Sequence, residues 1–467
     1  MKRYHEILKQ LLSLAFPIIF ANIISASSGL ISMFFIATLT PQALAAGAII
    51  TSTYGLVTMM VVSVLYSVSI LVGQNHGSDH YNVIGPIIFS GIALAFFIGI
   101  PLTCIMFYMT PILQLLQQPI EISEIAGKYF QGIAYGLIPG LIWAVFTQFF
   151  IGIAKAKLLL YFTFFGVLLN SIISYFFIFG FSTLKPMGVF GAGLATSLTS
   201  YISLALILIY VLLNSEFQKY RVMSKNAFNL NYCKLLLKIG TPISIQYTME
   251  LLVFSIITYL MGIIGTNALG AQQITLQFSM IAIMVVMGIS QSGSILVSQS
   301  LGAETAADRK IISNCSFTVG GLFMLMIGVI YWLFPNILIS LYLNIKDPSL
   351  SDTVSLARSI LFIVAFTQIF DAGRNIAAGL LRGYGDTKSS MWAGLISCWI
   401  VGLPLAIIFA FYFHFGAIGL RLGIMFGILF GCIHLMSRVF MINKNMRRFA
   451  PGDHHRSESV ITILRNQ

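Results

Sequence analysis

The sequence contains few charged residues: Asp, Glu, Lys and Arg make up 9% of its 467 positions, against about 25% in an average soluble domain. Because 58% of the residues are hydrophobic, a soluble globular protein of this length is excluded. The five cysteines form no CxxC pair and have no histidine at a spacing that builds a metal site. We interpret them as small packing residues inside apolar segments.

Several catalytic motifs are also absent from the sequence. There is no Walker P-loop, no GxGxxG after a strand, no HExxH and no soluble catalytic domain between the apolar runs. ATP-driven pumping would therefore need a separate chain. We predict that the chain is not an enzyme and that it uses no cofactor beyond a coupling ion.

The apolar residues occur in runs of roughly 20 to 30, and a bilayer core of about 30 Å needs about 20 such residues per helix. These runs are apolar all round, which excludes a β-barrel with alternating ten-residue segments. The sequence predicts an all-α polytopic membrane protein with twelve transmembrane helices. They are expected near 11–38, 44–72, 84–110, 125–152, 158–180, 188–213, 234–264, 268–300, 311–343, 353–381, 389–412 and 417–441.

The basic residues indicate the orientation in the membrane. Nineteen of the 26 lie in the termini and loops on one side, four lie in loops on the other side, and three lie within or at the ends of spans. By the positive-inside rule both termini are cytoplasmic, in a bacterial-type inner membrane. The net charge of +12 thus reflects topology and not nucleic-acid binding. One inner loop, 73–84, carries no Lys or Arg.

The chain consists of two related halves. Shifting the sequence by 225 residues places Pro17 on Pro242 and aligns 67–77 with 292–302, where seven of eleven residues are identical. Six spans per half make the repeats parallel, as in one class of secondary transporters. We predict a six-helix lobe over 1–213, a cytoplasmic linker over 214–233, a second six-helix lobe over 234–443 and a cytoplasmic tail over 444–467.

Two acidic residues are predicted to lie near the middle of the bilayer, Glu250 and Asp371. An ionisable group at that depth costs several kcal/mol unless it is paired or hydrated, and it usually marks an ion or substrate pathway. We predict that both residues couple transport to Na⁺ or H⁺, and that they ligate the metal if the ion is Na⁺. The alternative is that they only form hydrogen bonds between helices.

Arg374 follows Asp371 by three residues and so shares its helix face. An ion pair with Asp371 and an orientation toward a hydrated cavity both fit this spacing. With the pair formed, Glu250 in apolar surroundings would be the better proton carrier. The repeat aligns Glu250 with Ser25 and, at an offset of 231, Asp371 with Gly140. The first half therefore has no midplane acid, and ion coupling is expected in the second half.

Uncharged polar residues also occur at membrane depth. Each of these residues either forms a hydrogen bond between helices or contacts a ligand. The candidates for a substrate or ion cavity are Asn170, Gln246, Gln273, Gln277 and Asn375. Pro17 and Pro242 occupy equivalent positions, where a missing backbone hydrogen bond permits bending, so we predict hinges there.

Several segments together resemble the multidrug and toxic compound extrusion family, in its NorM-like branch, over about residues 8–443. They are LAFP at 14–17, GTPISIQYTMELLVF at 240–254, ALGAQQI at 268–274, DAGRNIAAGLLRGYGD at 371–386 and LLNSIISYFFIFG at 168–180. The resemblance implies two lobes around a central cavity and export of cationic or amphipathic compounds in exchange for Na⁺ or H⁺. It identifies Glu250 with the family's span-seven glutamate and Asn170 with its span-five asparagine.

The sequence departs from that family in span one, where Ser32 stands at a position that is commonly aspartate. A proton-binding mechanism in the first lobe is therefore not expected. Two other functions stay open: a flippase for lipid-linked precursors, and a channel or receptor without coupled transport. Arg374 is the single midplane base, which argues against an anionic lipid. We expect a monomer in the bilayer with small-molecule substrates.

Overall fold

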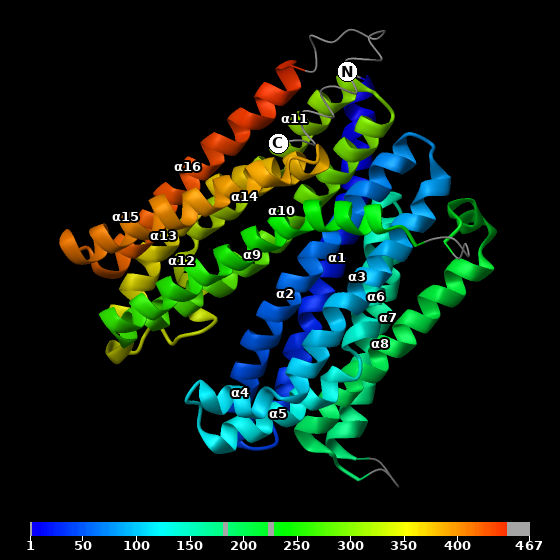
Figure 1. The fold of residues 1–467 in the computed structure, drawn as a ribbon. Coiled ribbons are helices and arrows are strands. Elements are labelled where there is room, and N and C mark those ends of the chain that lie inside the picture. The colour runs from blue at the N-terminus through cyan, green and yellow to red at the C-terminus, as the bar shows by residue number, and fades with distance from the viewer. Residues whose placement is uncertain (1, 181–184, 223–227, 446–467) are drawn as a thin grey trace. The chain divides into compact units, whose positions relative to one another are not determined.

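The computed structural model describes residues 2–180, 185–222 and 228–445, and every regular element in this part is helical (Figure 1). In the described part of the chain, eleven helices are long and apolar enough to cross a membrane, and the bent pair over 120–134 and 137–152 makes twelve when it is counted as one span. The prediction of twelve transmembrane segments is confirmed. Lys225 and the tail residues Arg447, Arg448, Arg456 and Arg465, which contribute to the predicted charge bias, lie outside the described residues.

The helices follow in the order that the sequence predicts. The first half contains α1 (Lys2–Ala37), α2 (Pro41–Gly77), α3 (Tyr81–Phe107), α4 (Met109–Leu115), α5 (Ile120–Ala134), α6 (Leu137–Gly152), α7 (Ala156–Phe179), α8 (Gly188–Leu213) and the 3₁₀ turn η1 (Ser215–Tyr220). The second half contains α9 (Leu230–Ile264), α10 (Thr266–Gly302), α11 (Ala306–Leu333), α12 (Pro335–Ser340), η2 (Pro348–Leu350), α13 (Ser351–Gly383), α14 (Thr387–Leu395), η3 (Ile396–Gly402), α15 (Leu403–Ile407), η4 (Ile408–Tyr412) and α16 (Gly416–Asn445).

The internal repeat is present in the backbone. Helices α2 and α10 both have 37 residues, and their first and last residues are 225 positions apart. The turns that follow them place Asp79 (φ 56°) and Glu304 (φ 57°) in the left-handed region. Ala154 (φ 60°) and Gly385 (φ 83°) repeat this conformation at the second offset of 231. Both sequence offsets therefore describe equivalent structure.

The chain forms two compact units, which we call the N-unit (residues 20–244) and the C-unit (residues 1–19 and 245–467). Helices α1 and α9 each begin in one unit and end in the other. Both changes occur within three residues of the equivalent prolines, Pro17 and Pro242. The predicted lobes 1–213 and 234–443, with the linker 214–233 between them, describe the sequence repeat and stay a prediction.

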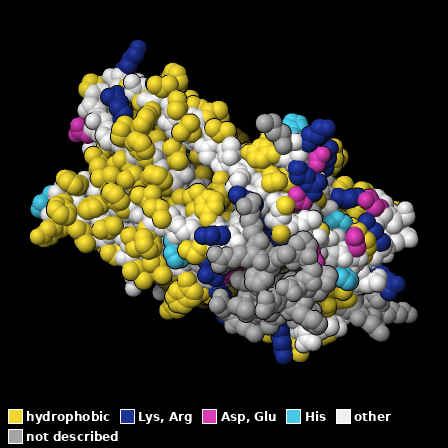
Figure 2. Space-filling view, turned by 90° about the horizontal axis from the view of Figure 1, so that it is seen from above, with side chains coloured by type: hydrophobic (Ala, Val, Ile, Leu, Met, Phe, Trp, Pro, Cys, Tyr) yellow, Lys and Arg dark blue, Asp and Glu magenta, His cyan; other side chains and the backbone are white. Residues whose placement is uncertain are grey.

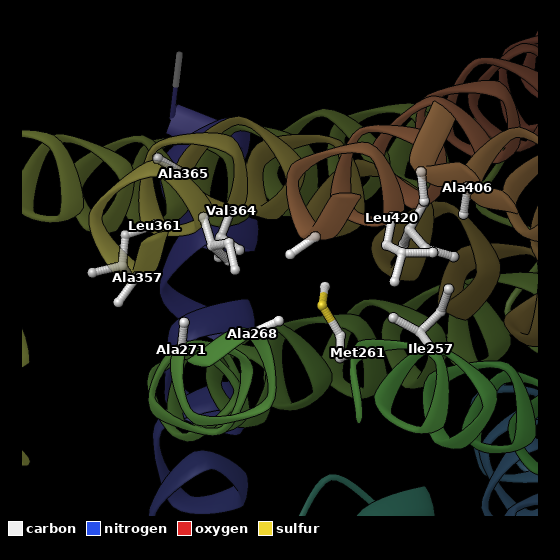
Figure 3. Close-up of a cluster of buried hydrophobic side chains, with 14 of the residues drawn as sticks. Ile257, Met261, Ala268, Ala271, Ala357, Leu361, Val364, Ala365, Ala406 and Leu420 are labelled. Carbon is white, nitrogen blue, oxygen red and sulfur yellow. The ribbon is translucent and has the colours of Figure 1, made fainter. Parts of the chain in front are cut away.

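In the C-unit, α13 is the central helix and packs against α10, α11 and α16. The first turns of α1 join this unit through Arg3, whose Nη2 and Nε donate to the Asp308 carboxylate of α11 at 2.6 and 2.9 Å. Ile19 packs over Gly288 of α10. A cluster of buried hydrophobic residues from α9, α10, α13, α15 and α16 fills the interior beside these helices (Figure 3). We call it the C-unit apolar cluster.

A row of glycines on α16 brings two backbones into direct contact. The glycines occur at every fourth position: Gly419, Gly423, Gly427 and Gly431. A Cβ on Gly427 would lie 2.5 Å from the Cα of Gly402 in the π-helical segment η3. Small residues at this spacing let transmembrane helices approach closely. At Gly427 the segment over 387–412 therefore packs on α16 through direct backbone contact.

In the N-unit, the segment predicted as one span over 125–152 is broken. Helices α5 and α6 meet at an angle of 57° after Ala134. At the break, Gly136 packs directly against Ser197 of α8, so that an added Cβ would lie 2.7 Å from the Ser197 hydroxyl. The prediction of one continuous helix was wrong here, because the contact with α8 has no signal in the local sequence.

The first part of the linker is a packed element. The 3₁₀ turn η1 contacts α3 and α8, and Phe217 and Tyr220 are only 2% and 1% exposed. This contact places the Lys219 ammonium 4.7 Å from the centre of the Tyr81 ring, a cation–π distance. The segment 214–233 thus supplies a positive charge next to the segment 73–84, which has no Lys or Arg of its own.

Large apolar side chains are exposed over much of the helix surface. Phe97 and Tyr259 are 76% and 73% exposed, in agreement with contact to lipid tails. Figure 2 shows broad hydrophobic areas on the face it presents, with the Lys, Arg, Asp and Glu side chains gathered in patches. The chain is a membrane protein with many spans.

Candidate functional site

Both predicted midplane acids lie inside the C-unit. Glu250 is on α9 and is 8% exposed, and Asp371 is on α13 and is 6% exposed. Arg374, one turn after Asp371 on α13, is 2% exposed and is among the largest fully buried side chains. Helices α9 and α13 therefore bring three ionisable groups together away from water.

Arg374 binds both carboxylates. Its Nη1 and Nη2 donate to the two oxygens of Glu250 at 2.5 and 3.2 Å. Its Nε and Nη2 also donate to Oδ1 of Asp371 at 3.0 and 2.8 Å. A planar guanidinium with several fixed donors suits this double contact, which a lysine could not make. Of the two orientations that the sequence left open for Arg374, the structure has the ion pair with Asp371.

The contact with Glu250 was not predicted. The sequence placed Glu250 in apolar surroundings because its neighbours on α9 are uncharged or aliphatic, and this expectation was wrong. Its partner Arg374 is 124 positions away, so helix spacing gives no information on it. We call Glu250, Asp371 and Arg374 the ion cluster.

A second layer of hydrogen bonds orients Glu250. Gln246, one turn earlier on α9, donates from Nε2 to Glu250 Oε1 at 3.0 Å. Its own carbonyl oxygen accepts from Arg382 Nη2 at 3.1 Å and from Ser390 Oγ at 2.9 Å. Arg382 also donates to the Tyr247 hydroxyl at 2.6 Å. Gln246 thus connects the ion cluster with the end of α13 and the start of α14.

Asn375 and two glycines complete the surroundings of the cluster. Asn375 donates from Nδ2 to the Asp371 backbone carbonyl at 3.0 Å. A Cβ on Gly394 would lie 3.1 Å from Glu250 Oε1, and a Cβ on Gly431 would lie 3.2 Å from Arg374 Cδ. Larger residues at these positions would displace the carboxylate or the guanidinium.

Among the described residues, no group of three or more His, Cys, Asp and Glu side chains could hold a metal ion. A bound Na⁺ would therefore rely on Glu250 and Asp371 and on neutral oxygens, such as the Asn375 side-chain carbonyl. The three charges of the ion cluster sum to −1. One monovalent cation, either Na⁺ or a proton, would neutralise them.

The remaining cavity candidates do not join the cluster. Gln273 and Gln277 are exposed side chains one turn apart on α10. Asn170 belongs to the N-unit, where it accepts from Ser28 and donates to Thr196 and Thr199, each at 3.4 Å. The predicted site residues thus separate into an ion cluster, an exposed pair and one residue in the N-unit.

Asn170 lines a cavity of about 550 Å³ within the N-unit. Ser, Thr, Tyr and apolar side chains line this N-unit cavity, and none of its lining residues is charged. Ser25 and Gly140, the repeat equivalents of Glu250 and Asp371, both line it, as does Ser32. The N-unit therefore has a neutral cavity in the region where the C-unit has charges.

Trp143, which was not among the predicted site residues, also lines the N-unit cavity. Its indole Nε1 is buried and has no hydrogen-bond partner among the described residues. The offset of 231 makes Trp143 the equivalent of Arg374, so the repeat could have identified it. The glycine row of α16 was also missed, although its spacing of four is visible in the sequence.

These features define an all-helical membrane protein built from two parallel six-helix repeats, with buried charges in one unit and a neutral cavity in the other. The sequence matches the MatE family over residues 17–176 and 242–408. The chain belongs to the MatE family, and it is a NorM-like member.

Relatives of known name cover nearly the whole chain. It is 28% identical over 425 residues to the probable multidrug resistance protein NorM of Mesorhizobium japonicum, covering 90% of this chain and 91% of that protein. The multidrug resistance protein NorM of Burkholderia vietnamiensis is also 28% identical, over 88% of this chain and 89% of its own length.

Solved structures share the fold. The eukaryotic MATE transporter AtDTX14 has a TM-score of 0.83 at 21% identity, covering 96% of this chain and 98% of its own. The Vibrio cholerae MATE transporter VcmN in its bent form has a TM-score of 0.84 at 18% identity, covering 96% and 99%. These comparisons confirm the predicted fold class.

Proposed function

We propose that this protein exports cationic or amphipathic compounds in exchange for Na⁺ or H⁺, with Glu250 and Asp371 as the residues that bind the ion. The observation that carries this proposal is the ion cluster: two carboxylates and one guanidinium, all at most 8% exposed. Buried ionisable groups in a membrane are costly and usually mark ion pathways. A net charge of −1 favours the binding of one monovalent cation.

Arg374 acts in this proposal as an internal competitor of the ion. Its four hydrogen bonds occupy three of the four carboxylate oxygens. A bound Na⁺ or proton takes over some of these contacts and adds a positive charge to the C-unit. Binding of a cationic compound then becomes less favourable, which gives the ion and the cargo opposite preferences, as exchange requires.

The N-unit cavity is the proposed site of the cargo. Its volume of about 550 Å³ lies within the range of about 300–1,000 Å³ that is typical of sites for drug-sized ligands. Asn170, Tyr54 and Trp143 offer polar and aromatic contacts to an amphipathic molecule. No lysine or arginine lines the cavity, which disfavours an anionic, lipid-linked precursor.

Pro17 and Pro242 are the proposed hinges. Each lies within three residues of the point where α1 or α9 passes from one unit to the other. A proline removes a helical hydrogen bond there and permits bending. We further propose a monomer in a bacterial-type inner membrane with both termini in the cytoplasm, which the excess of basic residues on one side supports.

The proposal is tested by efflux of a fluorescent organic cation from proteoliposomes, with a Na⁺ gradient and a pH gradient imposed separately. We expect uphill export under at least one gradient and none without a gradient. Flux that only follows the gradient of the fluorescent compound, and that is the same in Glu250→Gln, would refute exchange and favour the channel interpretation.

A further inference from the structure

Arg421 is a buried cation without a buried anion. This α16 residue is 6% exposed, and its Nη2 donates to the Thr275 hydroxyl of α10 at 3.2 Å. Its Nε has no partner, and no carboxylate lies within ion-pair distance of it among the described residues. Arg374, by contrast, binds two carboxylates. A buried guanidinium without an opposite charge is strongly unfavourable.

A second unsatisfied group lies one turn away. Gln272 is fully buried, and neither its side-chain nitrogen nor its side-chain oxygen has a hydrogen-bond partner in the described chain. It precedes Thr275, the partner of Arg421, by three residues on α10, so the two share a helix face. Arg421 Nε and Gln272 Nε2 thus have unused donors, and the Arg421 charge has no carboxylate in contact, so an acceptor that carries negative charge would satisfy both needs.

The surroundings exclude the usual way in which an arginine escapes burial. Leu420 and Ala271, the chain neighbours of Arg421 and Gln272, are fully buried members of the C-unit apolar cluster (Figure 3). Thr275 lies nine residues into α10, about 13 Å along the helix axis. The guanidinium of a side chain that is only 6% exposed thus contacts Thr275 inside the C-unit, unlike a snorkelling side chain, whose charged head stays in water.

We propose that a small monovalent anion of the size of chloride binds between the Arg421 guanidinium and the Gln272 amide. One positive charge calls for one negative charge, and a monatomic anion brings no further polar groups that would need partners among the buried apolar residues of the cluster. A water molecule would accept a hydrogen bond but would leave the charge uncompensated. This site is separate from the ion cluster, and the proposal does not depend on the proposed transport function.

The anion should stabilise the folded protein, because a ligand that binds only the folded state raises its stability. Purified protein is heated in detergent at constant ionic strength while gluconate is replaced by chloride. We expect the melting temperature to rise with chloride by about 3 °C in total and then to saturate. Bromide should give the same curve.

Two variants and one control assign the effect to this site. Gln272→Glu supplies a tethered anion, so it should melt in gluconate at least as high as the wild type in chloride, with no further response to chloride. Arg421→Leu removes the cation and should also lose the response. Arg358→Gln changes an exposed arginine that bonds only to the Asn336 side chain, and it should keep the response.

Crystals grown in bromide provide a readout that does not depend on how the variants fold. An anomalous peak within hydrogen-bond distance of Arg421 and Gln272 is expected in the wild type. A melting temperature that is independent of halide, or a Gln272→Glu protein that still responds to chloride, would overturn the proposal. Absence of a bromide peak at this position would do the same.

Discussion

Removing both carboxylates of the ion cluster should destabilise the protein far more than removing either one. Glu250→Gln and Asp371→Asn preserve shape but eliminate charge. Each single variant leaves Arg374 with one carboxylate and at least two charged hydrogen bonds. The double variant leaves a guanidinium that is 2% exposed with no anion in contact. Breaking a buried ion pair in this way costs about 3–5 kcal/mol.

Adding Arg374→Gln to the double variant removes the stranded charge, so the triple variant should recover most of that loss. The readout is the melting temperature in detergent, followed by size-exclusion chromatography after heating. For a unit of this size, 3–5 kcal/mol corresponds to a decrease of roughly 10 °C. Because Arg374 also binds Glu250, Asp371→Asn alone leaves it with a carboxylate in contact, and only the double variant removes both.

The comparison has its own control and a clear negative result. Arg358→Gln, at an exposed site, should melt within about 1 °C of the wild type, because surface changes have small effects. Two results would show that Arg374 does not depend on these two carboxylates. One is a double variant with the same melting temperature as the less stable single variant, and the other is a triple variant that is no more stable than the double variant.

Three further predictions concern transport and packing. Glu250→Gln should be inserted into the membrane normally but should lose gradient-driven efflux. In stopped-flow measurements, external Na⁺ or acid should no longer speed the release of a bound fluorescent cation from this variant. Ion-stimulated release that persists would place the coupling site elsewhere. Ser32→Asp should not rescue Glu250→Gln, because our proposal places the coupling site in the C-unit and not in the N-unit cavity. Restored efflux in the double variant would contradict this. Gly427→Leu should lower the free energy of unfolding by at least about 1–3 kcal/mol through overpacking against η3. Gly262→Leu is the control, because an added Cβ there meets nothing within 4 Å, and it should change this free energy by less than about 1 kcal/mol. Equal melting temperatures of the two variants would disprove the backbone contact at Gly427.

Much of the fold could be predicted from local composition. The twelve spans follow from runs of apolar residues, since the bilayer requires every backbone polar group to be satisfied within a helix. The repeat followed from direct comparison of the halves, and the equal lengths of α2 and α10 confirm it. The break after Ala134 could not be predicted, because it depends on Gly136 meeting α8, some sixty residues later.

The candidate site was predictable only in part. The burial of Glu250 and Asp371 followed from their distance to both ends of their spans. Helix periodicity allowed the Asp371–Arg374 pair but left an orientation of Arg374 toward a cavity open. The involvement of Gln246 as a link to Arg382 did not follow, because the relevant partners lie on different helices. The neutral N-unit cavity was indicated by the missing acids, but its volume and the position of Trp143 in it were not.

By itself, the sequence determined the class of protein, the number of spans and the asymmetry of charge between the halves, since these depend on composition along the chain. Only the tertiary structure decided that Arg374 binds Glu250 as well as Asp371 and that Lys219 lies over Tyr81, in a segment without Lys or Arg. It also decided that, among the described residues, Arg421 is buried without a carboxylate in contact and the Gln272 side chain without a hydrogen-bond partner. The physical reason is that side-chain contacts between helices depend on how each helix is rotated about its axis and crosses its neighbours. A span that is hydrophobic on all faces does not show which face is turned inward, so its sequence does not determine these contacts.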